Sequence, residues 1–445
     1  MPSGKYPTKS NSSTSSASSA RPNARGRGAW AGRFAARLAS LCALIVLLAL
    51  SAQPAPAQTY VDRRVTAIPA GVLVSRDPAS LVDPRRQKAG EQLDWDRRTL
   101  FFVWALSQVL ALAVLWRSGN AARLRDALTR SLRSPVLVRF VFGASVATVA
   151  ALASLPASIL RYHTETIYDL NHQPVFAWIA QNVGLWFLVA LAFGALTAFI
   201  YTLVARTRLW YVYTIVGLFA FVIGVGFVEP VAILPLFDRV HAAGRSAVIV
   251  ALERRAGAAD VPIVVDERAQ RSTLAIAAVI GYGPTKRIVL SDALIAESTS
   301  AEFAFVVARA LGHYLLTDPL KLALMRTLAF IIAIALGATI ADRVGFRRDD
   351  DALSRLPLVT ALMGVAALVL LPAYNAYARG IEARADRFAV ALTGDPASAV
   401  RYYVRLADEN LTPFCAPALE RAYFLDFPPL GSRAAAALRR PDPCV

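Results

Sequence analysis

Long uncharged apolar runs are the feature that most constrains how this 445-residue chain can fold. A helix needs roughly 17–25 consecutive apolar residues to cross the hydrocarbon core of a bilayer. Several runs of this length are separated by shorter charged or polar segments, so we predict a mainly α-helical, polytopic membrane protein with about six transmembrane helices. The runs are Leu100–Trp116, Val136–Leu160, Val175–Val204, Leu209–Phe227, Leu324–Ala341 and Leu356–Tyr374.

The residues ahead of the first run divide into three parts. Residues 1–30 are rich in small polar and basic residues, and we expect a disordered basic N-terminus. Residues 31–57 hold an arginine-flanked apolar stretch and then a small-residue A-x-A pattern, which is typical of a signal peptide, with an uncleaved signal anchor as the alternative. Residues 58–98 are charged and mixed, so we expect an aqueous segment.

The remaining chain divides into two predicted domains. Residues 99–236 would form an N-terminal transmembrane domain with four spans. Residues 237–445 would form a second domain with two further spans, at 324–341 and 356–374. Between the fourth and fifth spans, short strand patterns alternate with helical ones, which indicates a small α+β unit. The strand patterns are Pro262–Asp266 and Arg287–Ser291, the helical ones Ser246–Ala256 and Glu302–Leu316, and Gly281–Pro284 reads as a turn.

Basic residues exceed acidic ones, 48 to 31, for a net charge of +17. Because the arginines cluster beside the apolar runs, we interpret them as cytoplasmic loop charges and expect membrane lipids as partners, and no nucleic acid. The arginine-rich loops are 117–133, 206–208 and 343–355. With these loops in the cytoplasm, the second domain is extracytoplasmic, and we predict a bacterial inner-membrane location.

Cys415 and Cys444 lie in the C-terminal part of this second domain. They could form a disulfide on the extracytoplasmic side, where thiols are oxidised. Two unpaired thiols remain the alternative.

One helical pattern ends in Arg309-Ala310-Leu311-Gly312-His313, and a second segment, Ala378–Ala389, carries Glu382 and Asp386 four residues apart. The first is similar to an HExxH zinc helix and the second to an S-R-x-x-E-x-x-A-D-x-F-A helix. Other segments follow the same pattern in order, so the chain resembles the type-1 CAAX prenyl protease family of integral-membrane zinc metalloendopeptidases. These segments are Leu155–Ser158, Tyr168–Gln173, Ile233–Asp238, Arg271-Ser272, Gly281, Lys286–Leu290 and Phe427–Arg433.

The resemblance implies a zincin-like α+β domain, but the chain resembles a degenerate member of the family. Arg309 stands where the family motif has the histidine that is the first zinc ligand, and Ala310 stands where it has the glutamate that is the general base. His313 and Glu382 match the remaining two ligands. Asp386 matches the residue that supports the ligands. Arginine has no lone pair to donate and alanine cannot take a proton.

Other positions of the motif have changed as well. Phe427 replaces the late histidine of the family's H-P-P-x-x-E-R stretch, and Arg433 is retained. The strand that would hold substrate is Leu274, Ala275, Ile276 and Ala277, where the family's polar positions have become apolar.

We predict that Arg309 fills the position of the metal and pairs with Glu382, which would otherwise be a buried lone carboxylate. In the alternative, Arg309 extends to water and Glu382 pairs with Arg379 or Arg384.

The sequence leaves three hypotheses for function. The first is a catalytically inactive pseudopeptidase that acts as a binding or scaffold protein for a peptide, a lipid or a membrane-protein partner. The second is an active zinc-dependent endopeptidase that uses non-standard ligands. The third is a structural subunit of a membrane complex. We expect no cofactor, and zinc only if the family's activity is retained.

Overall fold

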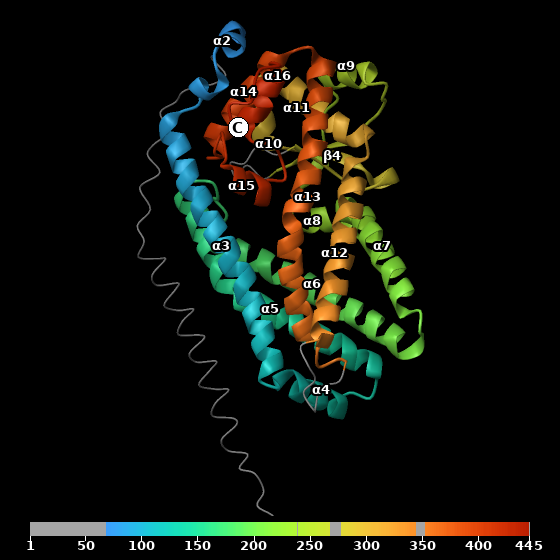
Figure 1. The fold of residues 1–445 in the computed structure, drawn as a ribbon. Coiled ribbons are helices and arrows are strands. Elements are labelled where there is room, and N and C mark those ends of the chain that lie inside the picture. The colour runs from blue at the N-terminus through green and yellow to red at the C-terminus, as the bar shows by residue number, and fades with distance from the viewer. Residues whose placement is uncertain (1–67, 238, 268–276, 344–351, 445) are drawn as a thin grey trace, which may run out of the picture. The chain divides into compact units, whose positions relative to one another are not determined.

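The computed structural model describes residues 68–237, 239–267, 277–343 and 352–444 (Figure 1). The predicted basic tail, the signal segment and three positions of the predicted substrate strand, Leu274, Ala275 and Ile276, lie outside these residues. Ahead of the first long helix, the described chain forms a short helix, α2 (Ala70–Ser75), and a 3₁₀ turn, η2 (Pro78–Leu81).

The described residues contain six helices that are long and apolar enough to cross a membrane, which confirms the predicted helical, polytopic fold. The fourth span continues from α7 through a π-helical turn, η3 (Glu229–Ile233), into α8 (Leu234–Phe237). A short helix, α4 (Asn120–Ser131), connects the first two spans. The span helices are α3 (Pro84–Arg117), α5 (Pro135–Ile167), α6 (Val175–Arg206), α7 (Trp210–Val228), α12 (Asp318–Arg343) and α13 (Leu356–Thr393).

Two of these helices extend well beyond their apolar runs. Helix α3 begins inside the segment that the sequence analysis placed in water, where the Asp83 carboxylate caps it by accepting the backbone N–H of Arg85 (2.8 Å). Helix α13 continues until Gly394, whose positive φ of 68° ends it. Caps, and not the end of the apolar run, therefore set the lengths of both helices.

The extension of α3 connects the membrane bundle to the polar end of the molecule. Arg86 Nε donates to the backbone carbonyl of Asp408 (2.7 Å), and the Asp408 carboxylate accepts the backbone N–H of Asp83 (3.0 Å). Three turns further on, Arg98 pairs with Glu420 (2.8 Å). One continuous helix thus contacts both the bundle and the C-terminal helices.

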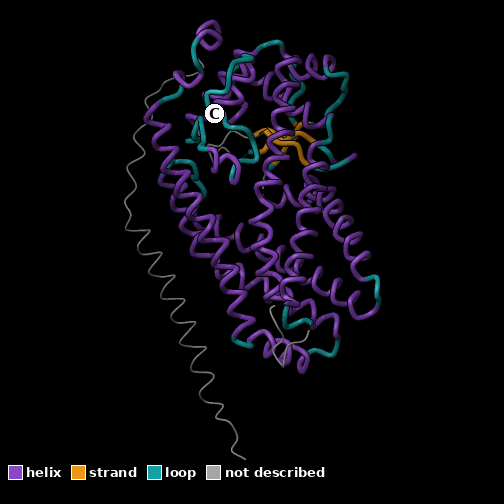
Figure 2. The backbone as a smooth tube through the Cα atoms, viewed as in Figure 1, coloured by secondary structure: helices purple, strands orange, loops and turns teal. Residues whose placement is uncertain are grey.

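The polar end is a small α+β unit, as predicted. Figure 2 shows the strands gathered toward one end of the long helices. The sheet order is β1-β2-β4-β3, with β2 and β4 parallel and the outer pairs antiparallel. The sequence analysis identified β2 and β4 but missed β1, which is only three residues long. The strands are β1 (Val240–Ala242), β2 (Ile263–Asp266), β3 (Ala277–Ile280) and β4 (Arg287–Ser291).

Helix α11 (Ser300–Leu315) passes through the centre of this unit. Its residues Phe305, Val306 and Leu311 have no exposed surface. A buried ion pair between Glu302 and Arg405 (3.0 Å) fixes it to α14. This packing makes α11 a rigid platform. The surrounding helices are α9 (Ala247–Arg255), α10 (Asp292–Glu297), α14 (Pro396–Glu409), α15 (Ala418–Tyr423) and α16 (Leu430–Ala437), and η4 (Gly283–Thr285) links the last two strands.

Cys415 and Cys444 form a disulfide across 29 residues. Of the two possibilities that the sequence left open, the structure therefore has the paired form. The bond connects the segment after α14 to the C-terminal end of the chain.

Helices α5 and α6 approach closely because small residues lie at their contact. A Cβ added at Gly194 would lie 2.8 Å from the backbone oxygen of Phe140, and one at Gly143 would lie 2.4 Å from the Thr197 hydroxyl oxygen. Small residues allow this kind of close backbone approach in membrane bundles.

We expect Gly194→Ala to destabilise the protein by about 1–3 kcal/mol, because the new methyl group must push two backbones apart. Thermal unfolding in detergent measures the loss. The matched control is Gly224→Ala, where an added Cβ meets nothing within 4 Å and helix propensity favours alanine. An equal loss at both positions would contradict the close-packing argument.

Candidate functional site

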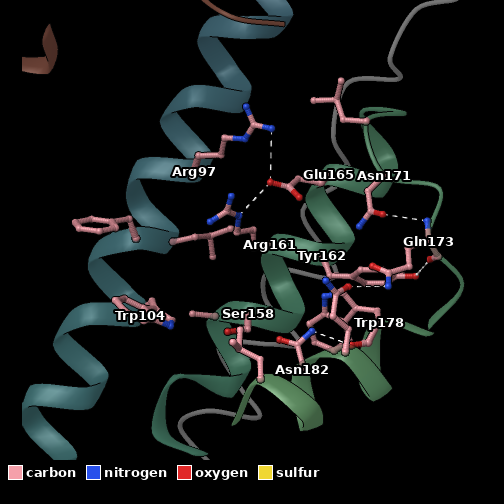
Figure 3. Close-up of a pocket in the computed structure, with 16 residues that line it drawn as sticks. Arg97, Trp104, Ser158, Arg161, Tyr162, Glu165, Asn171, Gln173, Trp178 and Asn182 are labelled. Carbon is pink, nitrogen blue, oxygen red and sulfur yellow. Dashed lines mark hydrogen bonds and ion pairs between the residues drawn. The ribbon is translucent and has the colours of Figure 1, made fainter. Parts of the chain in front are cut away.

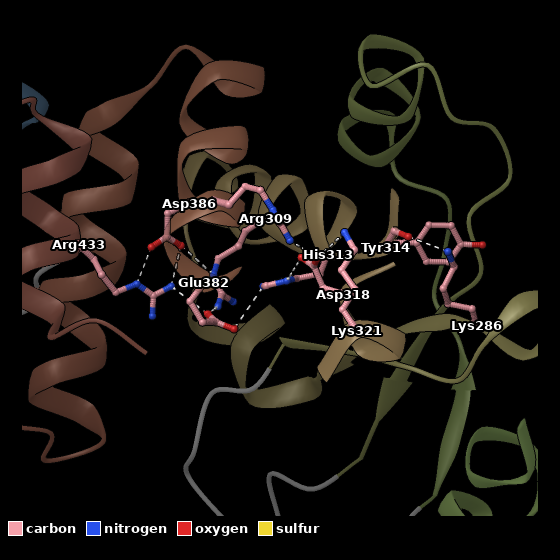
Figure 4. Close-up of polar contacts among 10 residues, drawn as sticks. Lys286, Arg309, His313, Tyr314, Asp318, Lys321, Glu382, Asp386 and Arg433 are labelled. Carbon is pink, nitrogen blue, oxygen red and sulfur yellow. Dashed lines mark hydrogen bonds and ion pairs between the residues drawn. The ribbon is translucent and has the colours of Figure 1, made fainter. Parts of the chain in front are cut away.

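The candidate site lies between α11 and α13 (Figure 4). Arg309 and His313 are four residues apart on α11, so they share one face of that helix. Glu382 and Asp386 have the same spacing on α13 and point toward them. All four residues that the sequence analysis selected here are therefore brought together.

Arg309 takes the central position between the two carboxylates. Its Nη2 donates to Glu382 Oε2, and its Nε donates to Asp386 Oδ1 at 3.0 Å. The Arg309 side chain is only 11% exposed. The predicted pair between Arg309 and Glu382 is confirmed.

The alternative partners of Glu382 are used elsewhere. Arg379 donates to the backbone carbonyls of Arg421 (2.8 Å) and Leu425 (2.6 Å). Arg384 donates to Asp318 at 2.5 Å.

A second guanidinium completes the cluster. Arg433, from α16, donates to both carboxylate oxygens of Asp386 at 2.7 Å and lies 3.6 Å from Glu382 Oε2. Its guanidinium also lies over the ring of Tyr403, 4.5 Å from the ring centroid. Burial alone would lower the pKa of Arg433. The effect of the adjacent Asp386 carboxylate is in the opposite direction and leaves the pKa of Arg433 above its usual value. Two cations and two anions thus balance in a mostly dry space.

His313 is held in an orientation suited to a metal ligand. Its Nδ1 lies 3.0 Å from Asp318 Oδ2, and its Nε2 lies 3.5 Å from Glu382 Oε1. Burial lowers the pKa of His313, which favours the neutral ring. A neutral His313 that donates Nδ1–H to Asp318 leaves the lone pair of Nε2 directed at Glu382.

The sequence analysis missed Asp318 and the cations around it. Arg384 and Lys321 both approach Asp318, at 2.5 and 3.6 Å. A usable signal existed: a carboxylate five residues after a ligand-type histidine is a candidate support for its ring. However, the position of Asp318 depends on the turn between α11 and α12. Thr317 in this turn has a positive φ of 52°, which the sequence did not reveal.

The donor set does not fit a catalytic zinc ion. Such an ion requires three protein ligands and an open position, and of the three ligand positions only those of His313 and Glu382 carry a donor, while the Asp386 carboxylate is taken up by Arg309 and Arg433. The third corner holds the permanent cation of Arg309. Among the described residues, no group of three or more His, Cys, Asp or Glu side chains could hold a metal, and residues 268–276 contain none of these residue types.

Three further positions that the sequence analysis selected, Ala310, Phe427 and Ala277, lie in or beside the α+β unit. Ala310 is 2% exposed and packs in the core of the α+β unit. Phe427 lies in the segment between α15 and α16 and is partly buried. Ala277 is the first residue of β3, at one edge of the sheet.

These features define a polytopic membrane protein whose polar domain has a metallopeptidase architecture. Comparison with known families agrees, because "CAAX prenyl protease N-terminal, five membrane helices" matches residues 82–239 and "Peptidase family M48" matches residues 241–441. The chain belongs to the CAAX prenyl protease (Ste24) family. Four of the six candidate spans among the described residues lie within the N-terminal match, residues 82–239.

Individual relatives cover most of the chain. It is 25% identical over 378 residues to "Uncharacterized metalloprotease YhfN" of Bacillus subtilis, covering 80% of this chain and 87% of that protein. It is 25% identical over 404 residues to "CAAX prenyl protease 1 homolog" of Arabidopsis thaliana, covering 84% and 93%. The fold is similar to that of Ste24p of S. mikatae, with a TM-score of 0.69 at 19% identity, covering 84% of this chain and 94% of that one.

We expect Arg309→Gln to lower the free energy of unfolding by about 1–3 kcal/mol, because it leaves two carboxylates close together with a single cation. Thermal unfolding of the purified protein is the measurement. The control is Arg387→Gln, which changes an exposed arginine on α13, the helix that carries Glu382 and Asp386. This variant should unfold like the natural chain. If Arg309→Gln unfolded like the control, the ion-pair cluster would not stabilise the site.

Proposed function

We propose that this member of the family is a pseudopeptidase, a membrane protein that binds a partner and does not cleave it. One observation carries the proposal: the guanidinium of Arg309 pairs with both Glu382 and Asp386 at the position of a zinc ligand. A cation in this position repels a second cation by several kcal/mol at about 4 Å when the effective dielectric constant is near 20.

The loss of the general base supports the same proposal. Alanine at position 310 provides no group to take a proton from an attacking water, and such a group typically contributes about 10²–10⁴-fold in rate. Two independent requirements of zinc proteolysis are thus unmet in one pentad.

A peptide partner is compatible with the sheet. Strand β3 pairs with β4 on one side, and it is last in the order of the described strands. An extended peptide can add to such an edge through main-chain hydrogen bonds. We therefore propose that the partner is an extended segment of a peptide or of another membrane protein.

The decisive experiment measures zinc in the purified protein. We expect zinc well below one ion per chain in the natural protein, and an amount approaching one in an Arg309→His/Ala310→Glu variant. In that variant the introduced imidazole would join His313 and Glu382 as the third donor. Elemental analysis after dialysis against trace zinc gives the stoichiometry.

The control is Ala310→Glu alone, which keeps Arg309 and should stay free of zinc. Near-stoichiometric zinc in the natural chain, lost in a His313→Ala variant, would contradict the pseudopeptidase proposal and favour an enzyme with non-standard ligands.

We also propose that the α+β unit faces the extracytoplasmic side. Two independent features support this orientation: the arginine-rich loops between spans, and the pairing of Cys415 with Cys444. Loops rich in arginine stay in the cytoplasm, and disulfides persist where thiols are oxidised.

Thiol labelling tests the orientation. In a Cys42→Ala background, the additional change Cys415→Ser frees Cys444, and we expect a membrane-impermeant maleimide to label it on intact spheroplasts. The chain with both cysteines should react only after reduction. Labelling that requires membrane disruption would reverse the proposed orientation.

A further inference from the structure

A cavity of about 770 Å³ lies between α3, the end of α5 and the start of α6 (Figure 3). None of its lining residues belongs to the cluster around Arg309, so the cavity is separate from the candidate site described above. It therefore calls for its own explanation.

The charged wall of this cavity has more cations than anions. Arg161 Nε donates to Glu165 Oε1 at 3.0 Å, and Arg97 Nη2 lies 3.5 Å from the same oxygen. Among the residues that line the cavity, two permanent cations thus share one carboxylate, which leaves its wall with a surplus of one positive charge; the next carboxylate that acts on Arg97, Asp94, lies outside the lining and pairs with Arg98. Within the part of the chain that the structure describes, the buried Nε of Arg97 has no hydrogen-bond acceptor. Surplus charge and an unused donor together indicate a site for an anion.

The cavity lies where three spans leave the apolar part of the bundle. Arg97 is three residues before the apolar run of α3, Glu165 is in the last turn of α5, and Trp178 is in the first turn of α6. Aromatic residues accompany the charges, as is usual at a membrane interface. Tyr162 packs on Trp178 with ring centroids 5.0 Å apart, and Trp104 is 43% exposed.

The wall opposite the arginines supplies amides and apolar surface. Gln173 donates to the side chain of Gln181 at 2.9 Å, and Asn182 also lines the cavity. Below them, toward the middle of α6, Leu185 lines the cavity and is 54% exposed. The same cavity thus offers cations, side-chain amides and an exposed apolar side.

We propose that this cavity binds the headgroup of an anionic phospholipid. The phosphodiester, with a charge of −1, matches the surplus charge of Arg97 and Arg161. The amides contact the polar substituent of the headgroup, and the acyl chains follow the exposed surface of Trp104 and Leu185. An anionic peptide is the less suitable ligand because it would leave this apolar side uncovered, whereas a lipid covers it with its own chains.

Native mass spectrometry of the purified full chain tests the proposal. The protein is mixed with phosphatidylglycerol or with phosphatidylcholine of the same acyl chains, and the retained lipid is counted. We expect preferential retention of phosphatidylglycerol, and a decrease of about tenfold in its apparent affinity in Arg161→Gln and in Arg97→Gln. The Arg161 side chain is 64% exposed, so its variant should fold, and thermal unfolding without added lipid checks this.

Arg130→Gln is the matched control, since Arg130 is an exposed arginine on α4, outside the cavity. It should retain phosphatidylglycerol like the natural chain. Equal retention of both lipids, or equal loss in the control and the cavity variants, would overturn the proposal. Binding of water-soluble glycerol 3-phosphate as tight as that of phosphatidylglycerol would also overturn the proposal, because it would show an anion site to which acyl chains contribute nothing. Tighter binding of an acidic peptide than of phosphatidylglycerol would overturn it as well.

Discussion

The guanidinium of Arg309, shared between Glu382 and Asp386, is the interaction on which the architecture around the candidate site depends. In a metal-binding relative of this fold, a divalent cation would balance the carboxylates between α11 and α13. Here a side chain supplies that positive charge permanently, and the second guanidinium of Arg433 supports Asp386 from the other side. Without these cations the two anions would be left poorly solvated, which is costly. The two carboxylates can therefore lie close together without a metal ion, because the two guanidinium groups balance their charge.

This substitution separates the structural role of a metal site from its chemical role. His313 and Glu382 keep the orientation of ligands, and Asp318 still supports the imidazole ring. What has gone is the third donor and the group that takes a proton, at positions 309 and 310. The remaining side chains hold α11 against α13, and strand β3 lies at the edge of the described sheet beside them.

Much of this could be predicted from the sequence, because hydrophobic length and motif spacing are local properties. The six spans, β2 and β4 follow from patterns within short windows, whereas the Arg309–Glu382 pair follows from the resemblance of two separate segments to the family's ligand helices. The contacts that the sequence did not predict depend on tertiary placement. Arg433 is 124 residues after Arg309, yet donates two hydrogen bonds to the same Asp386 carboxylate that Arg309 contacts, and Asp318 reaches His313 only through a left-handed turn at Thr317. The cavity beside Arg97 likewise requires three helices to meet, and no single window contains it.

The long helix α3 also has a mechanical consequence. Its capped N-terminal turns are fixed to the end of α14, and its fourth and fifth turns are fixed by Arg98 to Glu420, while the rest of the helix stands in the bundle. Both attachments lie in the N-terminal half of α3, so this half cannot move independently of the C-terminal helices. A tilt of α3 must therefore displace the C-terminal helices or break these contacts, so α3, like α13, couples the position of a membrane span to that of the polar end.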